Sequence, residues 1–457
     1  MNGRNCMAVP QVRRRSPCPP CLRGELVVVA VLLALSSHGA HAEGEDLRAT
    51  LAAAVDLPTP ETRLAAAGKL AARNDVTLDQ WLEAMRTFGD LQRVLPGSST
   101  EKATLQVGAA KEETSIAVFV PKGYAPGKPA PLLLALHGSG GEGHDEDDLW
   151  TAAADEIGMV VVAPTDPTAQ LGLAYSEAVR DRVLAALRWA RRRFDVDENR
   201  VSLTGVSRGG HLAWDVALRH PDQFAALVPM IGGPRLSPAE NNNLRYMENV
   251  AHLPIRDLQG SGDDPLLVKN LKIAFDRLAA AGAKDAKLVL HPDLKHDFDP
   301  HAVDWAKFLG AAKRTSPPLR VVRMCARTDE GRAAWAEVTR LAPGAIEKFR
   351  LDIEQRKSDA MSEDQKREWY AAEAEKRTGR LEVTFDGPGR FTAKATLVQR
   401  FRLLLSRDMF TAGAPVEVTV NGKAAKYGVT PSKLVLLREF VERFDRTFLP
   451  VAEVSCP

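Results

Sequence analysis

The sequence is poor in cysteine and has no apolar run at its start long enough to cross a bilayer. Five of its 457 residues are cysteines, and three of them fall within the first 21 residues. The apolar stretch Leu26–Leu35 is short, since a membrane-spanning helix needs about 20 residues. Cys18 and Cys21 resemble a redox pair, but their place ahead of this stretch favours removal with a signal segment over thioredoxin-like chemistry. No cysteine directly follows the stretch, so a lipid anchor at that point is not supported.

An excess of charge of one sign is also missing. The chain carries 61 Lys and Arg against 59 Asp and Glu, and five of the arginines and one glutamate lie within residues 1–42. The remainder therefore has a net charge of −2. No basic patch is left to indicate nucleic acid as a partner.

Residues 1–42 have the organisation of a signal peptide. Arginines precede the apolar stretch, and Ala40 and Ala42 are small residues of the kind that precede a cleavage site, here before Glu43. The segment before Leu26 is longer than usual, which leaves a translation start at Met7 or later open. The sequence predicts an exported protein, periplasmic or secreted, with no membrane span in the mature chain.

Ser207 stands in a strand, sharp turn and helix pattern. The apolar run Arg200–Thr204 leads into Gly205–Gly210 (GVSRGG), and a helical pattern follows. A serine at the apex of such a turn projects its hydroxyl above the carboxyl end of a parallel sheet. Glycine fits on both sides of Val206-Ser207-Arg208, because the turn is too tight for a Cβ beside the neighbouring strand and helix. Ser207 is the predicted nucleophile of an enzyme. The alternative is that this serine belongs to a purely structural turn in an inactive relative.

A second glycine-rich loop, His137–Gly141 (HGSGG), follows a run of buried-strand type. In hydrolases with a nucleophile elbow, such a loop supplies one backbone N–H of the oxyanion hole, and the residue after the nucleophile supplies the other. We therefore expect the amides of Ser139, or of a neighbouring glycine, and of Arg208 to hold an oxyanion. His137 fits the ordering of this loop better than the role of a base.

A serine hydroxyl needs a base to accept its proton, and the base needs an acid to fix its tautomer. Both are expected downstream at strand ends, in the order acid and then histidine. Asp263 follows an apolar strand pattern and is the predicted acid, with the adjacent Asp264 as the alternative. His296 lies in the loop after the last apolar strand pattern and is the predicted base. Its competitor, His291, belongs to the strand end, whereas a base must lie on a loop over the elbow.

These motifs carry a family resemblance. From about Ala103 to about Gly310 the chain resembles the α/β-hydrolases grouped with polyhydroxybutyrate depolymerases, feruloyl esterases and predicted secreted peptidases. The matching segments are Leu136–Gly141 (LHGSGG), Asp197–Gly210 (DENRVSLTGVSRGG), Arg219–Pro229 (RHPDQFAALVP), Gln259–Asp263 (QGSGD) and His296–Phe298 (HDF) ahead of Trp305. The resemblance implies the fold and a Ser-His-Asp triad, and it leaves ester and peptide substrates open. One departure is Gln259, because histidine usually precedes the glycine of the acid loop.

The pattern of elements predicts an α/β fold. Strands alternate with helices through residues 103–310, which favours a mostly parallel sheet covered on both faces. Two alternating segments, Thr104–Val107 and Ser115–Val120, predict antiparallel strands at its start. The predicted organisation is a signal peptide (1–42), a helical N-terminal segment (43–100), an α/β-hydrolase catalytic domain (101–315) and a β-rich C-terminal domain (316–457).

Within 316–457, strand patterns cover 319–324, 380–385, 391–398, 401–405 and 416–420, and the Asn421-Gly422 turn precedes a further strand at 423–427. A terminal helix is expected from Pro431 to about Phe448. The charged segment Ile346–Thr378 is interpreted as a solvated helical excursion rather than a partner-binding surface. Cys325 and Cys456 are predicted to form a disulfide after export, with two thiols as the alternative.

The sequence predicts no metal and no cofactor. Acidic residues at 142–148 lack the spaced ligands of a calcium loop, and His211 fits packing beneath the elbow better than catalysis. The predicted function is an exported serine hydrolase that cleaves a small or polymer-borne carboxylic ester through an acyl-enzyme. The alternatives are a serine peptidase of the same fold and an inert relative that binds polysaccharide or cell envelope through its β-rich domain.

Overall fold

The computed structural model describes residues 46–89, 91, 93–168, 176–237 and 242–457. The predicted signal peptide lies outside the described residues. Residues 46–457 form one compact unit, which contains all the elements described below.

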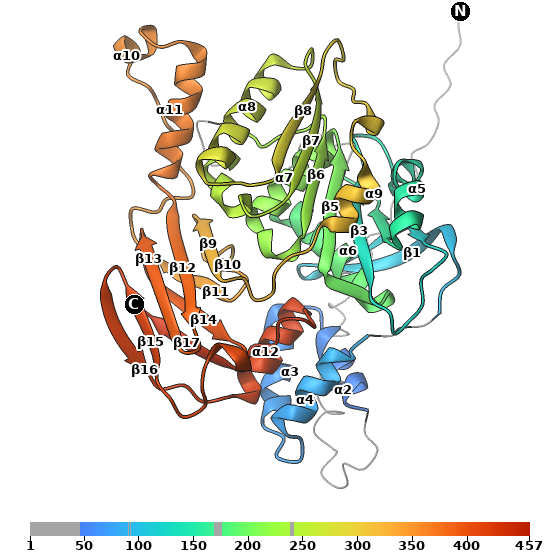
Figure 1. Cartoon of the computed structure of the whole chain (residues 1–457), viewed down its shortest axis with the longest axis vertical. Helices are drawn as coiled ribbons and strands as arrows, with labels where there is room; N and C mark the ends of the chain where they lie inside the picture. The colour runs from blue at the N-terminus through green and yellow to red at the C-terminus, as the bar shows by residue number, and fades with distance from the viewer. Residues whose placement is uncertain (1–45, 90, 92, 169–175, 238–241) are drawn as a thin grey trace, which may run out of the picture. The chain divides into compact units, whose positions relative to one another are not determined.

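An eight-stranded sheet runs through the middle of this unit in the order β1-β2-β4-β3-β5-β6-β7-β8 (Figure 1). Its strands are β1 (Gly97–Val107), β2 (Ala110–Val120), β3 (Ala130–Leu136), β4 (Val160–Pro164), β5 (Val196–Val206), β6 (Ala226–Met230), β7 (Ile255–Gly260) and β8 (Ala286–His291). β1 and β2 form an antiparallel hairpin, β2 pairs antiparallel with β4, and all pairs from β4 to β8 are parallel. This arrangement confirms the predicted mostly parallel sheet.

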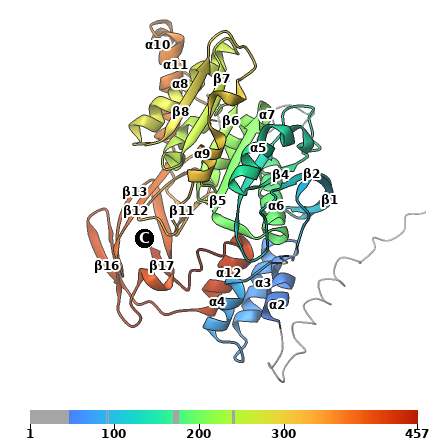
Figure 2. The same ribbon diagram turned by 45° about the vertical axis from the view of Figure 1, so that its right-hand side comes forward.

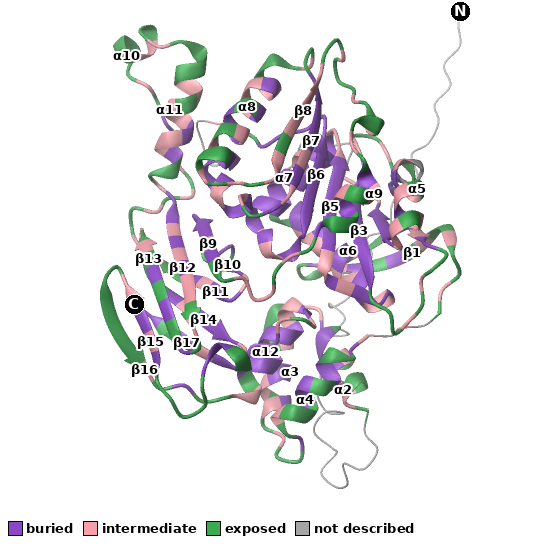
Figure 3. Ribbon diagram, in the orientation of Figure 1, coloured by how far each residue is buried: buried purple, intermediate pink, exposed green. Residues whose placement is uncertain are grey.

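Helices cover both faces of the sheet. Successive side chains of each strand point to opposite faces, so a buried strand contributes apolar side chains to both. Leu132, Leu134 and Leu136 of β3 join the apolar cluster formed with α6 (Glu177–Arg193), α7 (Arg208–Arg219) and α8 (Pro265–Ala280). Leu133 and Ala135 join the cluster on the other face, with α5 (Asp147–Ile157) and α9 (Trp305–Ala311). A strand buried on both faces needs a continuous apolar run, and β3 is buried at every residue (Figure 3).

The N-terminal helices pack against the end of the chain. They are α2 (Leu47–Val55), α3 (Pro60–Ala71) and α4 (Leu78–Arg86), and they lie beside α12 (Lys433–Arg443) in both views (Figures 1 and 2). Phe88 fills the space between them, with its ring 5.2 Å from that of Phe440 and 4.8 Å from that of Phe444. Arg63 of α3 pairs with Glu442 of α12 at 2.9 Å. The helical segment and the last helix therefore share one small core.

Two further sheets occupy the C-terminal region. The first has the order β16-β15-β13-β12-β9 and the second β10-β11-β14-β17. Their strands are β9 (Arg320–Cys325), β10 (Arg332–Ala333), β11 (Ala336–Leu341), β12 (Gly379–Gly387), β13 (Arg390–Thr396), β14 (Val398–Leu405), β15 (Val416–Val420), β16 (Lys423–Tyr427) and β17 (Ala452–Cys456). The sequence predicted this region as β-rich, which is confirmed, but β10, β11 and β17 were not predicted. The chain changes sheets at Leu397, whose φ of 54° breaks the run between β13 and β14.

The charged segment 346–378 holds α10 (Gln355–Asp359) and α11 (Glu363–Glu375). The predicted excursion is helical, but one side of α11 is not solvated. Ala371 and Ala374 are fully buried, and Asp364 pairs with Lys269 of α8 at 2.8 Å. Arg367 also donates to Asn270 at 2.6 Å. The charges therefore serve in part to attach α11 to the hydrolase helices.

The predicted disulfide between Cys325 and Cys456 is wrong. Both residues are buried free cysteines, and they belong to different sheets. Cys325 ends β9 opposite Gly379, whereas Cys456 ends β17 opposite Phe401. Burial raises the pKa of each thiol to about 11, so neither has the thiolate character that drives disulfide exchange.

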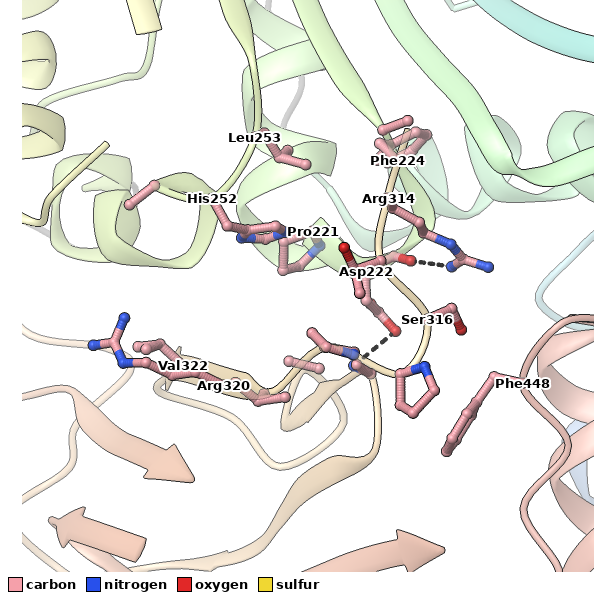
Figure 4. A pocket seen from close by; sticks show the side chains of 18 of the residues that line it. Pro221, Asp222, Phe224, His252, Leu253, Arg314, Ser316, Arg320, Val322 and Phe448 are labelled. Carbon is pink, nitrogen blue, oxygen red and sulfur yellow. Dashed lines mark hydrogen bonds between the residues drawn. The ribbon is translucent and has the colours of Figure 1, made fainter. Parts of the chain in front are cut away.

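A cavity of about 530 Å³ lies where the amino ends of β6, β7 and β8 meet the C-terminal region. Asp222 is central to it: its carboxylate accepts from the Ala334 N–H at 3.0 Å and pairs with Arg443, and its carbonyl accepts from Arg314 (Figure 4). Phe224, Leu253 and Phe448 add apolar surface. The lining charges near Asp222 are thus paired with one another across the junction of the two regions.

His220 makes stability sensitive to acid. Burial, with the guanidinium groups of Arg323 and Arg443, lowers its pKa to about 3. An unfolded histidine takes up a proton below about pH 6.5, so this contribution to the free energy of unfolding falls from about pH 6.5 down to the folded pKa. We expect His220→Gln to reduce the slope of unfolding free energy against pH by up to about 1.4 kcal/mol per pH unit in that window. Urea unfolding at pH 4 to 7 measures it, and His144→Gln, at an exposed position, is the matched control. Equal slopes in all three proteins would contradict the assignment.

Candidate active site

Ser207 occupies a strained turn between β5 and α7. β5 ends at Val206 and α7 begins at Arg208, and Ser207 has φ 53° and ψ −113°. A positive φ is costly for a residue with a side chain and persists only where the surroundings impose it. A Cβ on Gly205 would lie 2.3 Å from the carbonyl oxygen of Gly209, and one on Gly209 would lie 1.9 Å from that of Leu136. Glycine is therefore required at both positions, as the sequence indicated.

The structure brings Ser207, His296 and Asp263 together in one hydrogen-bonded row. Ser207 Oγ lies 2.8 Å from His296 Nε2, and His296 Nδ1 lies 2.8 Å from Asp263 Oδ2. The three residues follow β5, β8 and β7, so they meet at the carboxyl ends of parallel strands. Because the carboxylate can only accept, Nδ1 carries the proton and Nε2 presents a lone pair to the serine hydroxyl. This is the geometry in which a histidine can act as a base toward serine.

Asp263 is held in its ionised form. Burial opposes ionisation, but hydrogen bonds from His296, from the Asp264 N–H and from Gln259 outweigh it and lower the pKa of the carboxyl. The Asp263 side chain is 9% exposed, whereas that of His296 is 52% exposed. The Asp263 carboxylate is thus held in place, while the His296 imidazole is open to solvent.

Gln259 is a site residue that the sequence did not identify. It is fully buried at the end of β7, and its Nε2 donates to Asp263 Oδ2 at 2.6 Å, the oxygen that also accepts from His296. The sequence marked this position only as a departure from the histidine usual in such loops. The available signal was its place four residues before the acid, on the strand that carries the acid loop.

Removing the Gln259 amide should weaken the site without changing its shape. Gln259→Leu deletes the donor to Asp263, so the carboxyl loses a charge-assisted hydrogen bond and its pKa rises. A bond of this type contributes about 1.5 to 3 kcal/mol, and a loss of 1.36 kcal/mol from transition-state stabilisation is tenfold in rate. We expect kcat/KM for an ester to fall at least about tenfold, measured at fixed pH. An unchanged kcat/KM would show that Gln259 only fills space.

The alternative acid and base lie elsewhere. Asp264 caps α8, where its carboxylate accepts from the Leu266 N–H at 2.8 Å. His291 stays on β8, and its carbonyl accepts from the Ser261 N–H at 3.0 Å. In the described part of the chain, the buried Nε2 of His291 has no hydrogen-bond partner. His211 packs behind the elbow, with Nδ1 2.6 Å from the Gly233 carbonyl oxygen.

The two expected oxyanion donors lie on segments in direct contact. The loop that carries Ser139 passes so close to the elbow that a Cβ on Gly138 would lie 3.7 Å from the Ser207 Cβ. Arg208 is the first residue of α7, and amides at a helix N-terminus favour negative charge. The Arg208 side chain is buried and pairs with Asp166 at 2.6 Å, so it faces away from solvent. Both predicted donors therefore lie on segments that adjoin Ser207.

Over 46–457, without the short gaps in that range, no three His, Cys, Asp or Glu side chains lie together as metal ligands would. In the same residues, no helix combines the length and apolar character needed to cross a membrane.

Comparisons with known proteins agree with the fold. Residues 108–266, which include β3, Ser207 and Asp263, match the family described as "Putative esterase". The sheet order and this match place the chain in the α/β-hydrolase superfamily, which confirms the resemblance found in the sequence.

Two curated sequences are similar to part of the chain. "Putative esterase NocK" of Nocardia uniformis subsp. tsuyamanensis is 30% identical over 181 residues, which cover 35% of this chain and 47% of that protein. "Bifunctional acetylxylan esterase/xylanase XynS20E" of Neocallimastix patriciarum is 28% identical over 155 residues, 33% of this chain and 22% of that protein. The chain therefore spans less than half the length of either relative.

Solved structures resemble the chain over less than half of its length. A thermostable esterase matches 47% of this chain and 63% of its own, with 24% identity and a TM-score of 0.37. The poly(3-hydroxybutyrate) depolymerase LpqC of Bordetella parapertussis matches 44% of this chain and 85% of its own, with 20% identity and a TM-score of 0.36.

Proposed function

We propose that this protein is an exported serine hydrolase that cleaves carboxylic esters through an acyl-enzyme. The observation that carries the proposal is the row of two 2.8 Å contacts from Ser207 Oγ through His296 to Asp263, at a strained turn between strand and helix. Such a row has the parts needed to activate a serine hydroxyl. Export is supported by the apolar stretch Leu26–Leu35 and the small residues that follow it.

In the proposed reaction, Ser207 Oγ attacks the ester carbonyl carbon while His296 Nε2 takes the hydroxyl proton. Asp263 holds the imidazolium that forms, and the amides of Ser139 and Arg208 hold the carbonyl oxygen as it becomes an oxyanion. The tetrahedral intermediate collapses, the alcohol oxygen leaves with the proton from His296, and Ser207 is acylated. Water then repeats the sequence, giving its proton to His296, releasing the carboxylic acid and restoring the serine.

An ester is favoured over a peptide. The matching family and both similar sequences are described as esterases, and an alcohol leaving group makes fewer demands on the site than an amine. The inert binding alternative is weakened by the C-terminal aromatics, because Phe391, Phe401 and Phe410 are buried and Phe385 and Tyr427 are half-buried. They offer no exposed platform to a polysaccharide.

A panel of chromogenic substrates tests the proposal. We expect the protein to release p-nitrophenol from p-nitrophenyl acetate and butyrate, with much slower release of p-nitroaniline from peptide p-nitroanilides. Absorbance at fixed pH measures both, and Ser207→Ala supplies the background. Faster cleavage of the anilides would make the protein a peptidase, and no cleavage of either class above the Ser207→Ala background would leave the inert alternative.

A further inference from the structure

Three polar residues form a buried, hydrogen-bonded connection behind the two glycine-rich segments of the site. They are His137 at the start of the loop after β3, Asp166 just beyond β4, and Arg208 at the start of α7; we call them the brace. His137 is 2% exposed and Arg208 is 3% exposed, and the Asp166 side chain is 12% exposed. Buried polar groups of this kind cost free energy unless they are paired, so their arrangement is a specific feature of the fold.

Asp166 uses both its backbone and its carboxylate. Its N–H donates to His137 Nε2 at 2.8 Å, and its Oδ2 accepts from Arg208 at 2.6 Å. Its Oδ1 accepts from Arg182 of α6 at 2.9 Å and from the Thr168 N–H at 2.9 Å. One residue therefore connects the loop after β3 to the first residue of the helix after the nucleophile.

The contact to His137 fixes the ring in one tautomer. Nε2 accepts from the Asp166 N–H, so it carries no proton, and Nδ1 is the nitrogen that donates to the Gly138 carbonyl at 2.8 Å. That carbonyl and the N–H of Ser139 belong to the same planar trans peptide and point in opposite directions. Holding the Gly138 oxygen on the His137 side therefore turns the Ser139 N–H away from the ring. Among the described residues, no hydrogen bond occupies that N–H.

The contact to Arg208 acts on the second expected donor. Arg208 follows Ser207 directly, and its side chain is fixed by a charge-assisted bond at 2.6 Å. The backbone beside it packs closely against the end of β3, because a Cβ on Gly209 would lie 1.9 Å from the Leu136 carbonyl oxygen. The position of the Arg208 amide is thus set from both sides of the turn.

We propose that Asp166 is a positioning residue for the oxyanion hole, holding the Ser139 amide through His137 and the Arg208 amide through its side chain. This inference rests on the proposed function. A purely structural ion pair could be equally buried and short. It would not be expected to join both donor segments through one residue, as Asp166 does. Preorganised donors stabilise charge only where it develops, so a displaced donor affects the transition state more than the bound substrate.

The test is Asp166→Asn, which keeps the backbone N–H and the shape of the side chain and removes the charge that holds Arg208 and Arg182. Removal of one oxyanion donor costs about 10²- to 10³-fold in kcat, so displacement of the Arg208 donor alone should cost about 10- to 100-fold. We expect KM to change less than about twofold, and the inhibition constant of an aliphatic boronic acid, a transition-state analogue, to rise by the same factor as kcat falls.

Asp195→Asn is the matched control. Asp195 is also a buried aspartate that accepts from a backbone N–H, that of Gly127 at 2.9 Å, and from an arginine, Arg446 at 3.2 Å. It lies just before β5, at the end of the sheet away from Ser207. Asp195→Asn should lower the melting temperature as much as Asp166→Asn does. It should leave kcat and the boronic acid affinity unchanged.

Arg208→Lys keeps the proposal testable if Asp166→Asn does not fold. Lysine keeps the charge but not the shape of the guanidinium, so kcat and boronic acid affinity should fall in parallel by a smaller factor. Suppose that the wild-type protein is active. If the kcat of Asp166→Asn or Arg208→Lys then equals that of the wild type, or if only KM changes, the brace does not position the oxyanion hole. If wild-type protein neither hydrolyses esters nor reacts with fluorophosphonate, the proposed function fails, and the role of the brace fails with it.

Discussion

A fluorophosphonate probe will label Ser207 in the wild-type protein, and Ser207→Ala will abolish both labelling and ester hydrolysis. The reason is local: His296 Nε2 stands 2.8 Å from Ser207 Oγ, so the hydroxyl can lose its proton as it attacks phosphorus or a carbonyl carbon. Loss of the nucleophile in comparable triads costs on the order of 10⁶ in kcat, which makes this the largest effect expected of a single substitution.

The alanine variant is a clean test because it keeps the Cβ that the elbow accommodates at φ 53°. The fold should therefore survive, and a melting temperature within a few degrees of wild type would verify that. In-gel fluorescence and tandem mass spectrometry of the labelled peptide measure the outcome. Ser316→Ala, beside the cavity at the opposite end of the sheet, should label as the wild type does. Labelling that persists in Ser207→Ala, or that maps to another residue, would end the proposed mechanism.

The central sheet could be predicted from the sequence because the signals for its strands lie in short, continuous segments of the chain. β3 and β4 are buried on both faces, so each must be an uninterrupted apolar run, and such runs are visible without a structure. The elbow was equally visible, since Gly205 and Gly209 are required by contacts with backbone only a few residues or one strand away. Chain order then placed an acid and a base at the ends of β7 and β8, and the structure brings Asp263 and His296 to Ser207.

What the sequence could not supply depends on contacts between distant segments. The few terminal residues of β17 become a strand only by pairing with β14, which the sequence does not show. The two cysteines were predicted to form a disulfide, but they lie in different sheets. The role of Gln259 appears only once its amide meets Asp263. No sequence motif marked Asp166. It meets His137 and Arg208 only because β4, β3 and β5, which these residues follow, are neighbours in the folded sheet.

The second large effect separates the acid and base from their neighbours. His296→Ala should lower kcat by roughly 10³- to 10⁵-fold, because no other group in the row can take the Ser207 proton. His291→Ala should keep most activity, since that residue contributes its backbone to β8 and, among the described residues, its buried Nε2 has no hydrogen-bond partner. Steady-state kinetics on p-nitrophenyl acetate measures both variants. A loss in His291→Ala as large as that in His296→Ala would contradict the assignment of the base.

The same comparison for the acid is sharper, because the two candidates are adjacent and have different tasks. Asp263→Asn replaces the carboxylate oxygen bonded to His296 Nδ1 with a group that can present an N–H, which favours the wrong tautomer, so kcat should fall by about 10⁴-fold. Asp264→Asn leaves a side-chain oxygen for the Leu266 N–H, and asparagine caps helices as well as aspartate does, so both stability and kcat should stay near wild type. Kinetics and thermal denaturation of the two variants side by side decide the matter. If Asp264→Asn loses more activity than Asp263→Asn while both remain folded, the acid loop is one residue out of register with the arrangement described above, and Asp264 is the residue that orients His296.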